Sequence, residues 1–240
     1  MFLGWLTALA MSLLPVTGSA VEPTAAAHAA ESAAGASEAE AWIDDVATKA
    51  VGLRPEVLRM AVAAADCAAS RGEFDASPLL TVIDYSLPSV EPRLWVVDRE
   101  SHEVLFEELV AHGKNSGDNL TTAFSNTPDS LQTSLGLFVT GDTYVGTNGY
   151  SLRLDGLEPD FNDQARERAI VMHGAPYVSA RTARALGRLG RSWGCPAVSV
   201  ASARTIIDTV RGGTPVFAYY PDKTWLASSR FLNACGSPSR

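Results

Sequence analysis

From about residue 79 onward, the chain consists of short apolar runs separated by loops rich in Gly, Pro, Asn and Ser. Short runs of this composition between turn-forming residues are typical of β-strands. The strands that this pattern predicts are 79–84, 93–98, 104–111, 137–140, 150–154, 169–172 and 214–220. The turn-rich connection between the first two predicts a β-hairpin, and the polar segment 112–130 must be a loop. The chain is therefore expected to fold around a sheet whose loops carry the functional site.

Helical periodicity precedes this pattern and returns near its end. Residues 39–51 and 55–70 are predicted to form two helices, and Pro55 suits the first position of the second. Two further helices are predicted over 179–187 and 200–210. The predicted fold class is mainly β, a β-rich α+β fold, with one or two helices packed on the sheet and a small helical N-terminal segment before it.

The N-terminus has the composition of an export signal. Its first sixteen residues carry no charge and are mostly apolar, a run shorter than the roughly 20 residues that span a membrane. Small residues follow, ending at Ala20, so we expect a signal peptide over 1–20. No Lys or Arg precedes the apolar run, which leaves an uncleaved anchor or a misassigned start as alternatives. Residues 21–40 are rich in Ala, Glu and Ser and predict a flexible linker. We expect an exported protein of the periplasm or cell wall, with no membrane span after signal removal.

The charge of the chain is unevenly placed. Its formal net charge is −8, from 19 basic and 27 acidic residues. Residues 21–45 hold six of the acids and no Lys or Arg, so the remainder is nearly neutral. Because a nucleic-acid-binding protein usually presents a basic face, we expect no nucleic-acid partner. The sequence does not predict an oligomeric state.

The chain contains three cysteines, Cys67, Cys195 and Cys235. In an oxidising compartment an odd count leaves one thiol over. Pairing Cys67 with Cys235 would leave Cys195 free. Two unrelated thiols are the alternative, because spacing alone does not show that two Cα atoms come within about 7 Å.

Two segments could carry chemistry. One is an apolar run that ends in His173-Gly174, and the other reads Gly-Arg-Ser-Trp-Gly-Cys-Pro-Ala and contains Cys195. Glycine lets the backbone turn tightly and lets a ligand approach, and amides beside such a cysteine can face a developing oxyanion. A thiol needs a base or a cation nearby to be a strong nucleophile near neutral pH. His173 could be that partner, although spacing alone does not establish contact.

The order of these motifs resembles the catalytic domain of the L,D-transpeptidase (YkuD-like) family. His-Gly at a strand end is followed about twenty residues later by Ser-x-Gly-Cys, and then by a helix and a last strand. Residues 133–138 are also similar to the family's Thr-Pro-x-Gly-x-Phe segment. Further segments that resemble the divergent branch of the family are 80–88, 110–117, 134–136, 150–157, 169–178 and 187–198.

This resemblance implies a YkuD-like mixed β-sandwich as the catalytic domain over roughly residues 78–225. The domain would follow the signal peptide, the linker and a helical segment over 41–75, and it would precede a C-terminal tail over 226–240. The family acts on peptidoglycan stem peptides and requires no metal or organic cofactor.

The resemblance also implies a mechanism. The Cys195 thiolate would attack the carbonyl of the L-centre residue that precedes the terminal D-Ala of a tetrapeptide stem. D-Ala would leave, a thioester would form, and an amine of a neighbouring stem would resolve it. His173 would be the base, with its imidazole oriented by the carbonyl of Gly174. The amides of Gly194 and Cys195 would hold the oxyanion.

The sequence departs from the family motif at two places. The usual motif reads Ser/Thr-His-Gly-Cys, whereas Trp193 replaces the second His here. His173 must then suffice for proton transfer, or His112 must help. The Arg that usually follows the Cys is absent as well. Arg191 precedes it, and would either bind a stem carboxylate or brace the turn.

Several residues are predicted to contact the substrate, each with a structural alternative. Tyr150 and Arg153, expected to share one face of a strand, would contact the stem or simply pack. Trp193 would shape the acyl pocket or be a core plug. His112 would line the cleft or be an exposed loop histidine. Ser192 belongs to the motif turn itself.

Two rival functions use the same fold. An L,D-carboxypeptidase would form the same thioester and resolve it with water. A non-catalytic wall-binding domain is disfavoured by the intact Cys195 and His173, but the missing second His keeps it open.

Two other chemistries have weaker support. A zinc site of His112, His173 and Cys195 would lack any short ligand pair, so we expect no metal. The acids that could suggest a glycosidase are Asp142, Asp155 and Glu158. Their spacing fits turns and surface loops as well.

Overall fold

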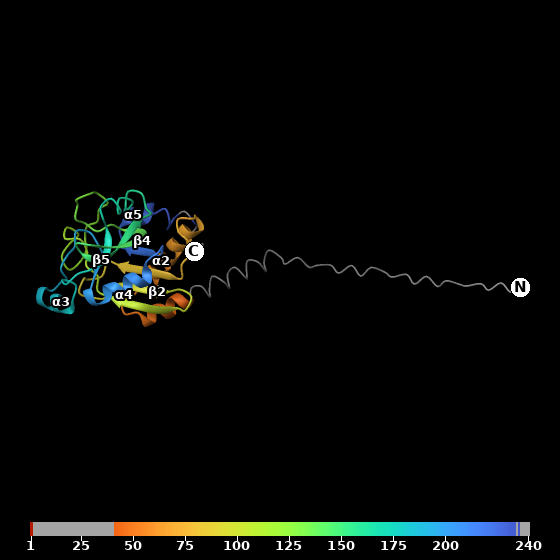
Figure 1. Ribbon diagram of the computed structural model, residues 1–240, viewed down its shortest axis with the longest axis horizontal. Coiled ribbons are helices and arrows are strands. Elements are labelled where there is room, and N and C mark those ends of the chain that lie inside the picture. The colour runs from red at the N-terminus through yellow and green to blue at the C-terminus, as the bar shows by residue number, and fades with distance from the viewer. Residues whose placement is uncertain (2–40, 234, 236–240) are drawn as a thin grey trace. The chain divides into compact units, whose positions relative to one another are not determined.

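The computed structural model describes residues 41–233, together with Met1 and Cys235 (Figure 1). The expected signal peptide and linker lie outside the described residues. In the part that is described, no helix is long and apolar enough to cross a membrane.

Eight strands form one sheet in the order β3-β2-β1-β8-β4-β5-β6-β7. They are β1 (Leu79–Asp84), β2 (Leu94–Asp98), β3 (Glu103–Glu108), β4 (Gly136–Gly146), β5 (Gly149–Gly156), β6 (Val171–Gly174), β7 (Ala197–Val198) and β8 (Pro215–Tyr219). The prediction of a β-rich fold with few packed helices is confirmed. The strands of the expected sandwich belong to one continuous hydrogen-bonded sheet.

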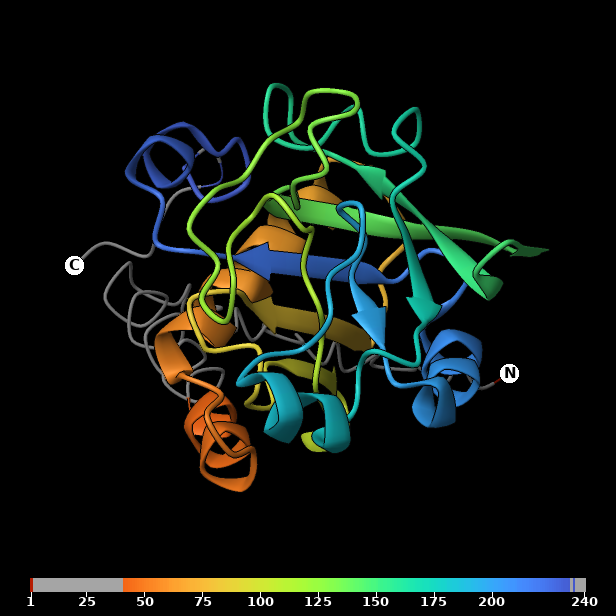
Figure 2. The same ribbon diagram turned by 90° about the vertical axis from the view of Figure 1, so that its left-hand side faces the viewer.

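The last strand completes the middle of the sheet. β8 pairs in parallel with β1, where Thr81 lies opposite Val216, and antiparallel with β4, where Leu137 lies opposite Phe217. Figure 2 shows the blue β8 between these two neighbours. β1 and β2 form the predicted antiparallel hairpin. Because both faces of the sheet are covered, β8 is buried along its whole length and its sequence is a continuous apolar run.

Two helices cover opposite faces of the sheet. α2 (Pro55–Ser70) has Pro55 at its first turn and packs its alanine-rich face on β1, β8 and β4. α4 (Val200–Val210) buries Ile206, Ile207 and Val210 against the other face, over β5 and β6. Residues 41–49 are also helical, within the predicted range 39–51 whose first two residues are not described.

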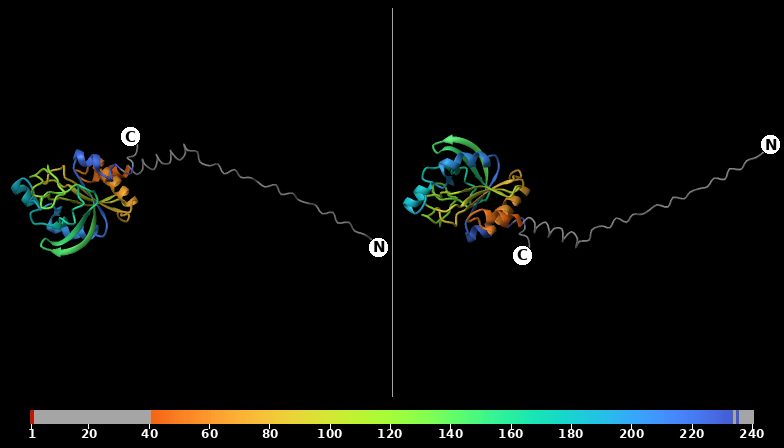
Figure 3. Two further views of the ribbon diagram at one scale, coloured as in Figure 1. Left: turned by 90° about the horizontal axis from the view of Figure 1, so that it is seen from above. Right: turned by 90° about the horizontal axis from the view of Figure 1, so that it is seen from below.

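The C-terminal segment packs on the core as well. α5 (Lys223–Ser228), which the sequence did not predict, buries Trp225, and Phe231 is buried after it. Both views of Figure 3 show α5, in dark blue, beside the orange N-terminal helices. A disulfide joins Cys67 of α2 to Cys235, with the two Cα atoms 5.6 Å apart. Residues 226–233 of the expected tail therefore lie against the same core as α2.

The strand that carries the histidine differs from its prediction in a way that matters for the site. It was predicted over 169–172 and spans Val171–Gly174. Ala169 has a φ of +52°, so a left-handed turn precedes the strand and delays its start. His173 and Gly174 consequently lie inside the sheet. Ala197–Val198, which pairs with them, was not predicted as a strand.

Candidate active site

Cys195 lies in a tight turn immediately before β7 and is 8% exposed. Ser192 closes this turn, because its Oγ donates to the Cys195 carbonyl (2.6 Å) and accepts the Gly194 N–H (3.1 Å). Gly194 has a φ of +124°, and a Cβ built there would lie 2.8 Å from the carbonyl oxygen of Gln132. Only glycine fits this position without strain. Gly194 of the motif is thus required by the backbone, whatever chemistry the neighbouring Cys195 performs.

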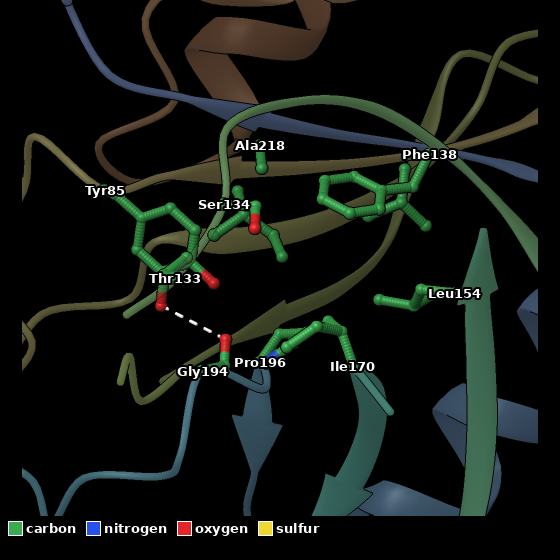
Figure 4. A pocket seen from close by; sticks show the side chains of 11 residues that line it. Tyr85, Thr133, Ser134, Phe138, Leu154, Ile170, Gly194, Pro196 and Ala218 are labelled. Carbon is green, nitrogen blue, oxygen red and sulfur yellow. Dashed lines mark hydrogen bonds between the residues drawn. The ribbon is translucent and has the colours of Figure 1, made fainter. Parts of the chain in front are cut away.

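Two distant loops hold the turn in place. The Ala111 N–H donates to the Ala197 carbonyl (2.8 Å), which draws the chain after β3 across to β7. This is why the strand predicted over 104–111 ends early, at Glu108. On the other side Thr133 donates its Oγ1 hydrogen to the Gly194 carbonyl (3.2 Å), as Figure 4 shows.

His173 is buried on β6, the strand next to β7, and lies opposite Ala197 in the parallel pairing. Its Nδ1 lies 3.1 Å from the carbonyl oxygen of Gly174, so Nδ1 carries the proton and Nε2 is the bare nitrogen. Gly174 allows α4 to approach closely, since a Cβ there would lie 2.9 Å from that of Ala203. Burial lowers the pKa of His173, so the imidazole is neutral at pH 7.

The fold brings the thiol, in the turn before β7, next to the strand that carries the imidazole, without joining them by a hydrogen bond. Cys195 precedes Ala197, the partner of His173, by two residues, and its Sγ lies 3.7 Å from the carbonyl oxygen of Ala169. Burial raises the pKa of the Cys195 thiol. Since burial disfavours both charged forms, the resting pair is a neutral thiol and a neutral imidazole.

A cation that the sequence analysis missed lies beside the thiol. The Arg168 guanidinium donates to neutral oxygens, including the carbonyls of Ser125 (2.7 Å) and Gln132 (2.6 Å), and the described residues offer it no carboxylate partner. Its Nη2 would lie 3.4 Å from a Cβ on Gly194. The positive charge opposes the effect of burial and lowers the pKa of the Cys195 thiol. The only available signal was the absence of the family's usual arginine after the cysteine.

Arg191 and Trp193, on either side of Ser192, have different environments. Arg191 donates from Nη1 to the Gly117 carbonyl (2.9 Å) and to Asp118 Oδ1 (3.0 Å), so it braces the loop, which is one of its two predicted roles. Trp193 is 74% exposed, with Lys114 Nζ 5.9 Å from its ring centroid. The alternative in which Trp193 plugs the core is therefore wrong.

His112 is only 1% exposed, which contradicts the alternative of an exposed loop histidine. Its Nδ1 accepts a hydrogen bond from Arg93 Nη2 (2.8 Å), and its Nε2 donates to the Gly117 carbonyl (3.3 Å). Burial and the neighbouring Arg93 lower the pKa of His112 to about 4. Because both ring nitrogens are engaged, His112 supports the loop and has no free nitrogen with which to help His173.

The expectation that Tyr150 and Arg153 share a face is wrong. They are three residues apart on β5, and side chains on one face of a strand recur every two residues. Arg153 lies opposite Val171, on the face that also carries His173, and stacks over Tyr144 (4.4 Å to the centroid). Tyr150 lies on the other face and donates its hydroxyl hydrogen to Asp208 of α4 (2.6 Å).

An open cleft of about 450 Å³ lies where β6 ends. It is lined by His173 and Gly174, by Pro176 and Tyr177 after the strand, and by Tyr150, Val200 and Arg204, among others. The second space, behind Gly194, is an apolar cavity of about 10 Å³ between Tyr85, Phe138 and Ile170 (Figure 4). That volume holds about one water molecule, so a peptide does not fit in this cavity.

The residues considered for a zinc site or for a glycosidase do not form such a site in the fold. In the described part of the chain, no group of three His, Cys, Asp or Glu side chains could hold a metal. Of the acids considered for a glycosidase, Asp155 pairs with Arg166. Glu158 is buried, where it accepts hydrogen bonds from the Leu137 N–H and Trp225 Nε1.

These features define a β-rich domain that holds a buried thiol in a glycine turn, next to a strand that carries an imidazole with a free Nε2. The chain belongs to the L,D-transpeptidase catalytic domain family, whose model matches residues 49–219.

Among solved structures, similar chains include L,D-transpeptidases at low identity. The L,D-transpeptidase from Mycobacterium smegmatis is 16% identical, with a TM-score of 0.38 over 60% of this chain and 59% of that chain. L,D-transpeptidase 3 from Mycobacterium tuberculosis is 15% identical, with a TM-score of 0.37 over 60% of this chain and 61% of that chain. The chain thus spans about three-fifths of these structures, and family membership rests on the family match. No curated protein matches the chain.

Proposed function

We propose that the protein is a peptidoglycan L,D-transpeptidase with Cys195 as its nucleophile. The observation that carries this proposal is the free Cys195 thiol in a glycine turn, beside the strand that carries a histidine with an unoccupied Nε2. The cleft beside His173 has room for a peptide, and family membership supports a stem-peptide substrate.

The acylation step follows from the neutral resting pair. His173 Nε2 accepts the thiol proton while Sγ attacks the carbonyl carbon of the L-centre residue in a tetrapeptide stem. The tetrahedral intermediate collapses with cleavage of the bond to D-Ala, and the imidazolium returns the proton to the leaving amine. An amine of a second stem then attacks the thioester, with His173 accepting its proton, and the thiol is regenerated.

The oxyanion needs a hydrogen-bond donor in the turn. Of the two amides expected there, that of Gly194 already donates to Ser192 Oγ, so we assign this role to the Cys195 N–H. Arg168 supports the same step as a positioning residue, because its charge favours the thiolate that forms during attack.

The proposal is tested by the mass of the intact protein after mixing with a disaccharide-tetrapeptide. We expect an adduct equal to the donor minus D-Ala, and a crosslinked dimer once a second stem is present. Hydrolysis without dimer would instead favour the L,D-carboxypeptidase. An unchanged tetrapeptide and no adduct would contradict both enzymes and favour a wall-binding domain.

Replacing Arg168 is expected to slow acylation about tenfold at pH 7, because losing the adjacent cation raises the pKa of the Cys195 thiol further and disfavours the thiolate. The measurement is the rate of Cys195 alkylation by iodoacetamide as a function of pH, whose midpoint should move upward in Arg168→Met. Arg168→Lys keeps the charge but not the fork of hydrogen bonds. It should restore the midpoint, whereas a purely structural role predicts that it does not.

The location of the protein belongs to the same proposal. An enzyme that acts on cell-wall stems must work outside the cytoplasm, which agrees with the expected signal peptide. An oxidising compartment would also preserve the bond between Cys67 and Cys235. That bond closes a loop across most of the described chain and stabilises the fold mainly by restricting the unfolded state.

A further inference from the structure

The segment around the site has a charge opposite to that of the chain. Residues 168–207 include β6, α3, β7 and most of α4, and they contain no Asp or Glu, in a chain whose formal net charge is −8. The basic residues in this segment are Arg168, Arg181, Arg184, Arg188, Arg191 and Arg204. A concentration of one sign at a cleft raises the local concentration of ligands of the opposite sign.

Four of these arginines already have a partner. Arg168 donates hydrogen bonds to the loop over residues 125–134, and Arg188 and Arg191 both approach Asp118. Arg204 stacks over the Tyr150 ring at the cleft, 4.6 Å from its centroid. These contacts give each of them a structural role.

Arg181 and Arg184 have no such role. Both are exposed, and in the described part of the chain neither forms a hydrogen bond or an ion pair with another side chain. They lie three positions apart on α3 (Ala180–Leu186), so they project from one side of the helix. None of the residues of α3 is buried, and Figure 1 shows the helix at the edge of the molecule.

The position of α3 is nevertheless well defined. Ser179 caps its start by accepting the Thr182 N–H (3.1 Å), and Gly187 ends it with a φ of +65°. Val178 before the helix and Leu189 after it are buried in one small cluster. A seven-residue helix is too short to be stable alone, so these anchors hold it in place with its two arginines pointing outward. Tyr177, just before the helix, lines the cleft, so the two arginines lie near the cleft.

We propose that Arg181 and Arg184 form a docking surface for the carboxylates of polymeric peptidoglycan, next to the cleft that accepts one stem. The proposal rests on the proposed function and adds to it a second contact with the polymer. Each tetrapeptide stem ends in a D-Ala carboxylate, and the guanidinium fork binds carboxylates with two hydrogen bonds. A polymer offers many such stems at once, so weak contacts to neighbouring stems add to binding at the cleft.

The test is sedimentation of the full chain with purified peptidoglycan sacculi, in a Cys195→Ala background that prevents turnover. Arg181→Gln/Arg184→Gln should weaken binding about fivefold, the effect expected for two exposed ion pairs. The matched control is Arg71→Gln/Arg211→Gln, which removes the same charge from exposed positions outside the basic segment. Circular dichroism establishes that each variant is folded.

Further measurements separate this proposal from the alternatives. At 1 M salt, where the screening length is about 3 Å, or with sacculi whose carboxylates are amidated, both double variants should bind equally. Equal binding to untreated sacculi at low salt would overturn the docking surface. Acylation by a soluble disaccharide-tetrapeptide should be unchanged in Arg181→Gln/Arg184→Gln with Cys195 intact, and its loss would place these residues in the active site instead. If the unsubstituted protein is not acylated at all, the proposed function fails, whatever the sacculi show.

Discussion

Replacing Cys195 by alanine is expected to lower the rate of D-Ala release and of dimer formation by about 10⁴-fold or more, because no other group can form the acyl intermediate. The measurement is chromatography of a tetrapeptide reaction with mass detection of D-Ala and dimer. The adduct on the intact protein should disappear at the same time. A rate that falls by less than tenfold would show that Cys195 is not the nucleophile.

The matched control for this prediction removes the other two cysteines. Cys67→Ala/Cys235→Ala lacks the disulfide but keeps Cys195, so it should still be acylated under conditions where it is folded. Cys195→Ala itself should remain folded. The Sγ has one weak hydrogen bond, to Ala169, and deleting a single buried atom costs far less than the stability of a domain.

The order of strands and helices was largely predictable from the sequence, because local periodicity determines them. The segments predicted over 79–84, 93–98 and 200–210 agree with β1, β2 and α4 to within one residue. The predictions failed where pairing with a distant strand, and not the local sequence, decides whether a segment is a strand. Ala197–Val198 is too short to have a pattern of its own and is a strand only because β6 and Ala111 pair with it.

The surroundings of the candidate site were less predictable than its two central residues. Cys195 and His173 stand in motifs that can be read along the chain. Arg168 is far from the cysteine in sequence, and only the fold brings it beside Gly194. His112 looked exposed because its neighbours are polar, yet a buried Arg93 that lies nineteen residues earlier binds its Nδ1.

Replacing His173 by asparagine is expected to lower kcat/KM for the tetrapeptide by about 10²- to 10⁴-fold, the usual contribution of a positioned general base. Asparagine can keep the hydrogen bond to the Gly174 carbonyl but has no nitrogen that accepts the thiol proton. The measurement is the initial rate of D-Ala release at several pH values. His102→Asn, a change at a histidine on the β2–β3 turn, should leave the rate unchanged.

The pH profile separates catalysis by His173 from a role in packing. Burial lowers the pKa of His173 below its ordinary 6.5, so the base is unprotonated at pH 7 and is lost only as the pH falls through that lower value. The unsubstituted protein should therefore keep its full rate at pH 7 and lose it only as the pH falls through this lowered pKa of His173. Burial also raises the pKa of the Cys195 thiol, so without His173 the thiol ionises only at higher pH. In His173→Asn the plateau near pH 7 should disappear, and the remaining rate should rise with pH up to the raised pKa of the Cys195 thiol as the thiolate forms. A variant that keeps a plateau near pH 7 and declines only at acidic pH would show that another group accepts the proton.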